Sequence, residues 1–143
     1  MKSNSMYYTL AVLKPDCIRR KLSGKAIDFI ESHGFEIVAL RKLTLTRTQA
    51  QNFYAVHKDK DFFKDLIQFM ISGPCIPMVL KKENAVHAFR EIIGKTDPQE
   101  AAPGTLRHMY ATTTRQNIVH GSDSDENAQK EIAFYFPIRE IID

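Results

Sequence analysis

The feature that most constrains the fold is an alternation of two hydrophobic periodicities along the chain. Runs of β-forming apolar residues predict strands at 7–13, 35–45 and 78–80. Between and after them, helical spacing predicts helices at 25–33, 61–70, 85–93 and 125–133. Strands and helices that alternate in this way bury their apolar faces by packing helices on a sheet. We therefore expect an α+β fold, an α/β sandwich in which helices cover an antiparallel sheet.

Several residues mark where these helices should begin and end. Gly34 and Gly94 follow the helices at 25–33 and 85–93 and are typical C-terminal caps. Thr46 and Gln49 have the spacing of a capping box, and Asp61 is a candidate N-cap. The two helices that start there are expected to form a helical hairpin.

Length and composition narrow the class of protein. The 143 residues are 43% hydrophobic, which suits one domain over residues 1–143. The formal charge is +3, and the basic residues are scattered, which suits small anionic ligands as well as nucleic acid. Cys17 and Cys75 match no metal or disulfide pattern, so we expect a reducing, cytoplasmic location. The chain has no apolar run of membrane-spanning length.

The stretch from Lys95 to Ser124 shows no periodicity, and a loop of this length in a compact domain is often functional. The chain has neither a P-loop nor a G-x-G-x-x-G motif. Side chains would therefore have to bind any phosphate, and the candidates are Lys14, Arg90, Thr96 and Arg107. Taken singly, each is equally well explained as a solvated surface residue.

His120 is the candidate nucleophile. It lies in Asn117-Ile118-Val119-His120-Gly121-Ser122-Asp123, which we interpret as a loop before a helix. A neutral imidazole is a good nucleophile near pH 7 when a carboxylate fixes its tautomer. Ser122, Asp123 and Glu131 are nearby candidates for that role, although an isolated loop histidine is more often only solvated.

This segment resembles the active-site signature of the nucleoside diphosphate kinases. Other segments agree with the family in order and spacing over nearly the whole chain. They are Leu13-Lys14-Pro15-Asp16, Phe53-Tyr54, Asp61-Phe62-Phe63, Ser72-Gly73-Pro74, Asn84 through Arg90, Gly94 through Pro98, Pro103 through Arg107 and Glu131 through Phe134.

The resemblance implies a role for each matching residue. His120 would accept the γ-phosphoryl group of a nucleoside triphosphate as a pros-phosphohistidine and pass it to a diphosphate by a ping-pong mechanism. Other matching residues would serve the imidazole, the phosphates, the ribose and the base. Glu131 and Ser122 would orient the imidazole, with Tyr54 beside it; Lys14, Arg90, Thr96 and Arg107 would bind phosphates; Lys14 and Asn117 would contact the ribose; Phe62 would stack on the base. Stacking on one aromatic face tolerates any base, so broad specificity, for ribo- and deoxyribonucleotides, is expected.

The resemblance also implies a ferredoxin-like βαββαβ fold with additional helices, and a homo-oligomer. The short end after Pro137 favours a bacterial-type tetramer over a hexamer. Mg²⁺ should arrive with the nucleotide, with no metal site made by protein side chains. The chain departs from common family patterns at Thr114, within the polar stretch Tyr110 to Arg115, which bears on base packing, and at Cys75-Ile76-Pro77, which bears on strand packing.

Two other classes of function compete with this interpretation. A ferredoxin-like sheet can bind single-stranded nucleic acid, but Phe62 and Phe63 fall on an expected helix rather than on a central strand. A relative that binds nucleotides without turnover is the other alternative. The remaining histidines, His33, His57, His87 and His108, show no metal-ligand spacing and are expected at helix ends or on the surface.

Overall fold

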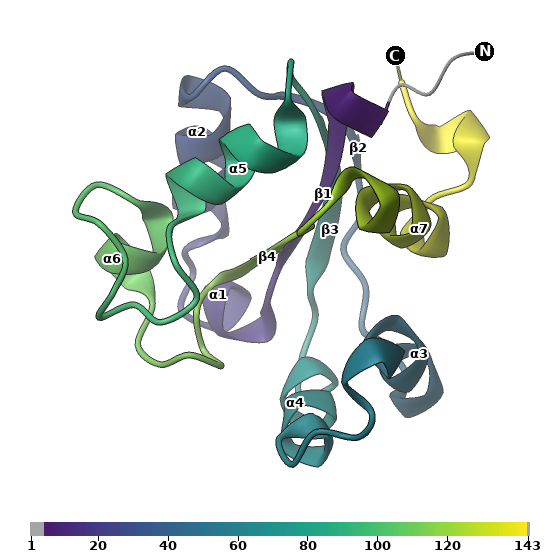
Figure 1. Ribbon diagram of the computed structural model, residues 1–143. Helices are drawn as coiled ribbons and strands as arrows, with labels where there is room; N and C mark the ends of the chain where they lie inside the picture. Colours follow the sequence, from purple (N-terminus) through teal and green to yellow (C-terminus); the bar gives the residue numbers. More distant parts are fainter. Residues whose placement is uncertain (1–4, 143) are drawn as a thin grey trace.

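The computed structural model describes residues 5–142. Its sheet has four strands in the order β2-β3-β1-β4, and every neighbouring pair is antiparallel. The strands are β1 (Tyr8–Leu13), β2 (Glu36–Leu40), β3 (Ile76–Lys81) and β4 (Val119–Gly121). This is the ferredoxin-like βαββαβ arrangement with additional helices that the sequence predicted (Figure 1).

Helices occupy most of the segments between the strands. They are α1 (Pro15–Arg19), α2 (Ser23–Ser32), α3 (Arg47–Phe53), α4 (Phe63–Met70), α5 (Ala85–Ile93), α6 (Leu106–Tyr110) and α7 (Asp125–Tyr135). Short 3₁₀ turns lie at Ser5–Tyr7, Ala55–His57 and Ile138–Glu140. Thr46 and Gln49 form the expected capping box of α3, and Gly94 ends α5 with a φ of 90°.

The two faces of the sheet carry separate hydrophobic clusters. Helices α2 and α5 cover one face, whereas α3, α4 and α7 lie on the other (Figure 1). The alternation of side chains along β1 divides its residues between them: Ala11 and Leu13 pack towards α2 and α5, and Leu10 and Val12 towards the opposite layer. Helices therefore cover both faces, which leaves no open sheet of the kind that stacks single-stranded nucleic acid.

The second strand is shorter than the sequence predicted. Regular pairing ends at Leu40, after a β-bulge between Ile37 and Ala39, and only an isolated bridge from Leu43 to Cys75 continues it. The expectation that 35–45 forms one strand covered on both faces is therefore wrong. Leu40 is 46% exposed at the edge of the sheet.

The stretch from 95 to 124 is not one loop, because it contains α6 and β4. His120 therefore lies on a strand rather than in a loop. Asp61 does not cap a helix either, since Phe62 is the N-cap of α4 and forms no side-chain cap hydrogen bond. Within residues 5–142, no helix combines the length and the hydrophobicity needed to cross a membrane.

Candidate active site

Strand β4 determines the direction in which His120 points. Val119 packs in the cluster beneath α2 and α5, and a Cβ on Gly121 would lie 3.0 Å from the Phe89 ring of α5. The absence of a side chain at Gly121 therefore lets β4 lie close to α5. Because side chains alternate along a strand, His120 projects from the other face, where its ring contacts the Phe53 ring at 5.4 Å between centroids.

Glu131 of α7 points back to His120. Its Oε1 lies 2.9 Å from His120 Nε2 and accepts a 2.6 Å hydrogen bond from Ser122 Oγ. Ser122 is fully buried, and its Oγ also accepts a hydrogen bond from the Leu10 amide of β1. An ionised carboxylate only accepts hydrogen bonds, so Nε2 carries the imidazole proton in the neutral ring. Nδ1 is then the unprotonated nitrogen, and it has no hydrogen-bond partner within residues 5–142.

The side chain of His120 lines a cavity of about 700 Å³. Elements from four parts of the chain surround it: the α3 end with the following 3₁₀ turn, helix α5, the segment at Thr96 to Arg107, and β4 with α7. Seven of the eleven candidate residues named from the sequence line it, namely Tyr54, Arg90, Thr96, Arg107, His120, Asp123 and Glu131. The other four, Lys14, Phe62, Asn117 and Ser122, lie outside this lining.

Arg107 is held rigidly beside His120. The Arg107 guanidinium donates hydrogen bonds to Gly94 O at 2.9 Å and to Val119 O at 2.7 Å. Glycine is required at position 94, because the chain there passes so close to Thr105 that a Cβ would lie 2.5 Å from Thr105 Oγ1. Burial, together with the nearby positive charge of Arg90, lowers the pKa of Arg107 to about 10. The site therefore holds two repelling cations, an arrangement that favours a bound anion.

Lys14 connects the end of β1 to the same region. Its Nζ donates to Asn117 Oδ1 at 2.8 Å and to Arg115 O at 3.3 Å, and Asn117 Nδ2 donates to Thr96 O at 3.1 Å. Burial lowers the pKa of Lys14 to about 7, and the positive charges of Arg107 and Arg115 contribute to the decrease. A buried ammonium next to two guanidinium groups also favours an anionic ligand.

Phe62 stands at the start of α4 and is 42% exposed. The His57 ring packs against it at 5.5 Å between centroids. Arg115 reaches it from the polar stretch before Asn117, since its Nη2 donates to Phe62 O at 3.4 Å and its Nη1 lies 4.0 Å from Asp65 Oδ2. Arg115 thus connects this stretch to the helical hairpin beside an exposed aromatic ring.

Tyr54 lies beside His120 as the sequence predicted, with ring centroids 6.5 Å apart at 89°. Its hydroxyl is buried and has no hydrogen-bond partner among the described residues. Burial raises the pKa of this phenol far above its ordinary value, so Tyr54 stays protonated. Burial likewise raises the pKa of the Cys17 and Cys75 thiols to about 12, which fits structural roles for both.

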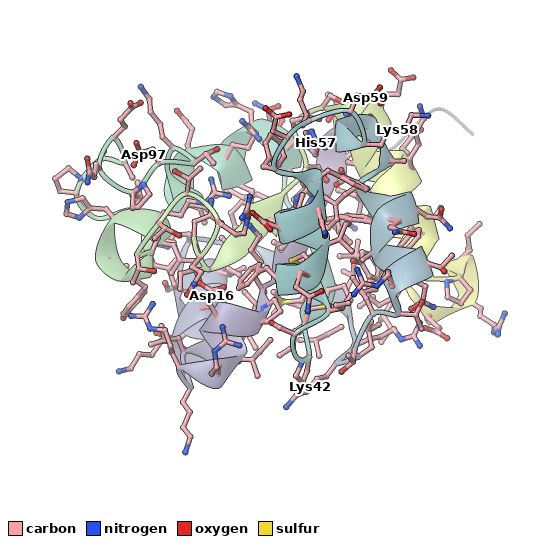
Figure 2. All side chains as sticks on the ribbon, turned by 90° about the horizontal axis from the view of Figure 1, so that it is seen from below. Asp16, Lys42, His57, Lys58, Asp59 and Asp97 are labelled. Carbon is pink, nitrogen blue, oxygen red and sulfur yellow. The ribbon has the colours of Figure 1, made fainter. Side chains whose placement is uncertain are left out.

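Sequence reasoning missed part of this site. His57 was expected at a helix end or on the surface; it ends the 3₁₀ turn Ala55–His57, but it also lines the cavity, and Figure 2 shows it with Lys58 and Asp59 in the same turn. Asn127 and Lys130 also line the cavity, and Asn127 Nδ2 donates a 2.6 Å hydrogen bond to Asp123, a residue that the sequence did offer as a candidate. The four-residue spacing of Asp123 and Asn127, on either side of the Ser124 N-cap of α7, was the sequence signal that could have indicated Asn127. Among residues 5–142 no three His, Cys, Asp or Glu side chains are grouped so as to bind a metal.

Comparison with known proteins identifies the family. The sequence model described as "Nucleoside diphosphate kinase" matches residues 7–141. The chain belongs to the nucleoside diphosphate kinase family. It is 56% identical over 137 residues to the nucleoside diphosphate kinase of Chlorobaculum parvum, covering 96% of this chain and 98% of the relative. It is 53% identical over 134 residues to that of Salinibacter ruber, covering 94% of each.

Solved structures of nucleoside diphosphate kinases agree with this assignment. The enzyme from Aquifex aeolicus superimposes with a TM-score of 0.93 at 42% identity, covering 95% of this chain and 99% of that one. The halophilic enzyme from Halobacterium salinarum, solved in complex with CDP, gives 0.91 at 36% identity, covering 95% and 91%. The protein is therefore a nucleoside diphosphate kinase, a phosphotransferase that binds nucleotides and transfers phosphoryl groups between them.

Proposed function

We propose that the enzyme transfers the γ-phosphoryl group by a ping-pong mechanism through a pros-phosphohistidine at His120. The lone pair of Nδ1 attacks the γ-phosphorus, the bond to the bridging oxygen breaks, and the diphosphate leaves with that electron pair. A β-phosphate oxygen of a second diphosphate then attacks the phosphorus, and the bond to Nδ1 breaks. The observation that carries this proposal is that Glu131 binds Nε2, which leaves Nδ1 free at the cavity.

Glu131 and Ser122 act on the imidazole in this mechanism. As Nδ1 forms its bond to phosphorus, the ring becomes cationic, and the carboxylate at 2.9 Å from Nε2 stabilises that charge. The hydrogen bond from Ser122 Oγ keeps Glu131 in place. Because Ser122 is buried and already donates to Glu131, it is poorly placed to be the phosphate carrier itself. Tyr54 packs beside the ring and limits its rotation.

We assign phosphate binding to Lys14, Arg90, Thr96 and Arg107. Phosphoryl transfer depends mainly on positioning and on stabilising charge spread over the phosphoryl oxygens, and fixed cations perform both tasks. Arg107 is fixed by two carbonyl groups, and Arg90 is close enough to lower its pKa. Lys14 and Asn117, joined at 2.8 Å, are assigned to the ribose as well.

The base is assigned to the exposed Phe62 ring. An aromatic face offers stacking to purines and pyrimidines alike, so we infer broad base specificity, for ribo- and deoxyribonucleotides. Mg²⁺ enters as part of the nucleotide substrate, where it neutralises part of the charge of the outer phosphates. We further propose that residues 1–143 act as one domain in the cytoplasm and assemble as a homo-oligomer, with a tetramer favoured over a hexamer.

Phosphoryl labelling tests the mechanism. The enzyme is mixed with a γ-labelled triphosphate without acceptor, and the label should be stable to alkali, labile to acid, and dischargeable by any nucleoside diphosphate. His120→Ala should abolish labelling and exchange, whereas His87→Ala, on the exposed face of α5, should behave like the wild type. Acid-stable label, or exchange retained by His120→Ala, would contradict the proposed intermediate.

A further inference from the structure

The backbone immediately before β4 is strained. Ile118 has a φ of +78°, a left-handed conformation that β-branched residues rarely adopt. The Val119 amide donates to Asn117 O at 2.9 Å, which closes a γ-turn around Ile118. This turn separates Asn117, which binds Lys14, from His120. A strained conformation persists only where its surroundings hold it.

Asp16 is the side chain that holds this turn. It lies on α1 (labelled in Figure 2), is 1% exposed, and its Oδ2 accepts a 3.1 Å hydrogen bond from the Ile118 amide. The carbonyl of Ile118 accepts a 2.9 Å hydrogen bond from the Lys14 amide. The segment from Lys14 to Asp16 therefore binds both polar groups of the strained residue. Asp16 does not itself line the 700 Å³ cavity.

We propose that Asp16 is a positioning residue of the phosphoryl transfer: its carboxylate holds the Ile118 turn that places Asn117 and His120, and supplies a negative charge next to Lys14. The roles of Lys14, Asn117 and His120 in this statement rest on the function proposed above. The hydrogen bonds of Asp16 and the conformation of Ile118 do not depend on that function.

The electrostatic part of the proposal, that Asp16 supplies a negative charge next to Lys14, follows from the charges that surround Lys14. Arg107 and Arg115 lower its pKa along with burial, and Asp16 opposes them by raising it. Burial raises the pKa of Asp16 itself, and the Ile118 amide and the Lys14 charge oppose that rise. Asp16 therefore keeps a larger fraction of Lys14 protonated at neutral pH. Without it, Lys14 would face, among residues 5–142, only positive charges and neutral acceptors.

Two substitutions separate the charge from the hydrogen bond. Asp16→Asn keeps an oxygen that can accept from the Ile118 amide but removes the negative charge. Asp16→Ala removes both. Asp28→Asn, an exposed aspartate on α2, is the matched control for loss of one negative charge. The titration of Lys14 is followed by NMR in enzyme labelled at the lysine Cε, with Lys14→Met used to assign the signal.

We expect the Lys14 titration in Asp16→Asn to move to lower pH by about 0.5 to 1, and the alkaline limb of kcat/KM to move with it. The Asp28→Asn control should leave both unchanged. In Asp16→Ala we also expect the phosphorylation of His120 to slow about 10- to 100-fold, since a loosened turn misplaces the ring. If Asp16→Ala fails to fold, Asp16→Asn still decides the electrostatic part of the proposal, and Asp16→Leu, which has a similar shape and no hydrogen-bond acceptor, tests the part that concerns the Ile118 turn.

An unchanged Lys14 titration in folded Asp16→Asn would overturn the proposal, as would Asp16→Ala phosphorylating His120 at the wild-type rate. The NMR measurement needs no turnover, so it gives a result even if His120 carries no phosphoryl group. If the wild type formed no phosphohistidine but the Lys14 titration still moved in Asp16→Asn, the proposed function would be contradicted and the electrostatic role of Asp16 retained.

Discussion

Lys14→Met should make the protein more stable while impairing it as an enzyme. Methionine has a similar length and no charge, so the substitution removes a buried ammonium without opening a large cavity. Burial lowers the Lys14 pKa from 10.5 to about 7. At about 1.4 kcal/mol for each tenfold change in protonation, the charged side chain costs the fold on the order of 5 kcal/mol at low pH.

The lost hydrogen bonds offset part of this gain. Lys14 Nζ donates to Asn117 Oδ1 and Arg115 O, and these acceptors would lose a partner at a cost of about 1–3 kcal/mol. We therefore expect Lys14→Met to raise the free energy of unfolding by about 2–4 kcal/mol at pH 6. In the same variant the proposed phosphate and ribose contacts of Lys14 are gone, so transfer should be much slower.

The pH dependence has a defined direction. The folded-state pKa of Lys14 is below its unfolded value, so between about pH 7 and 10.5 the unfolded wild type holds a proton that the folded form has released. The contribution of Lys14 to the free energy of unfolding of the wild type therefore rises with pH across that window, by up to about 1.4 kcal/mol per pH unit. The advantage of Lys14→Met should be constant below about pH 7, shrink above it, and change sign before pH 10.5, where only the cost of the lost hydrogen bonds remains.

Urea unfolding followed by far-UV circular dichroism at pH 6, 7.5 and 9 measures this difference, and it suits a chain without tryptophan. Protein concentration must be held fixed, because assembly would shift the apparent stability. Titrating groups that do not interact with Lys14 are common to both proteins and cancel in the difference, whereas Asp16, whose pKa the Lys14 charge lowers, does not cancel. A variant less stable than the wild type at pH 6, or a difference that does not change with pH, would refute the reasoning.

Two further predictions concern nucleotide binding and phosphoryl transfer. Phe62→Ala should weaken binding of ATP and CTP alike, by roughly 1–3 kcal/mol in calorimetric titrations, and loss confined to one of them would reveal recognition of the base edge. Arg90→Ala and Arg107→Ala should both slow His120 phosphorylation in rapid-quench experiments, but only Arg107→Ala should also lower the Tm, because Arg107 holds two backbone carbonyls whereas Arg90 is exposed. Equal Tm values for the two variants would contradict this distinction.

The elements that could be predicted from the sequence are those whose signals are local. Helix α5 has apolar residues at helical spacing and a glycine at its end, and its bounds match the prediction. The Thr46 and Gln49 capping box depends on four consecutive residues, so it too could be identified. The first and third strands were found because their apolar runs are buried on both faces of a central sheet.

The missed elements depend on contacts between distant parts of the chain. Strand β4 is three residues long, too short to show a period of two, and exists because it pairs with β1. Helices α1 and α6 have five residues each, less than two helical turns. The wrong N-cap at Asp61 has a related cause, because a turn closed by the hydrogen bond from the Phe63 amide to Lys60 O moves the start of α4 past it.

The site shows the same contrast between what local sequence signals indicate and what depends on contacts between distant parts of the chain. The resemblance identified which side chains belong to it, but the residues gave no indication that Glu131 points back to His120. That contact requires α7 to pack against β1, which places Glu131 next to His120 on the neighbouring strand β4. The position of His57 at the cavity was missed because it depends on the packing of its turn beside Phe62, which the sequence does not show.

Several residues that are hard to explain from the needs of the fold share one property: each carries a charge or a backbone conformation that costs the fold free energy. Lys14 is buried as a cation, and Arg107 is buried near a second guanidinium. Ile118 is held in a conformation that its side chain disfavours. Local rules are violated in this way mainly at functional sites. A polyphosphate adds negative charge beside these two buried cations, so the charges whose burial is costly in the free protein favour the binding of its substrate.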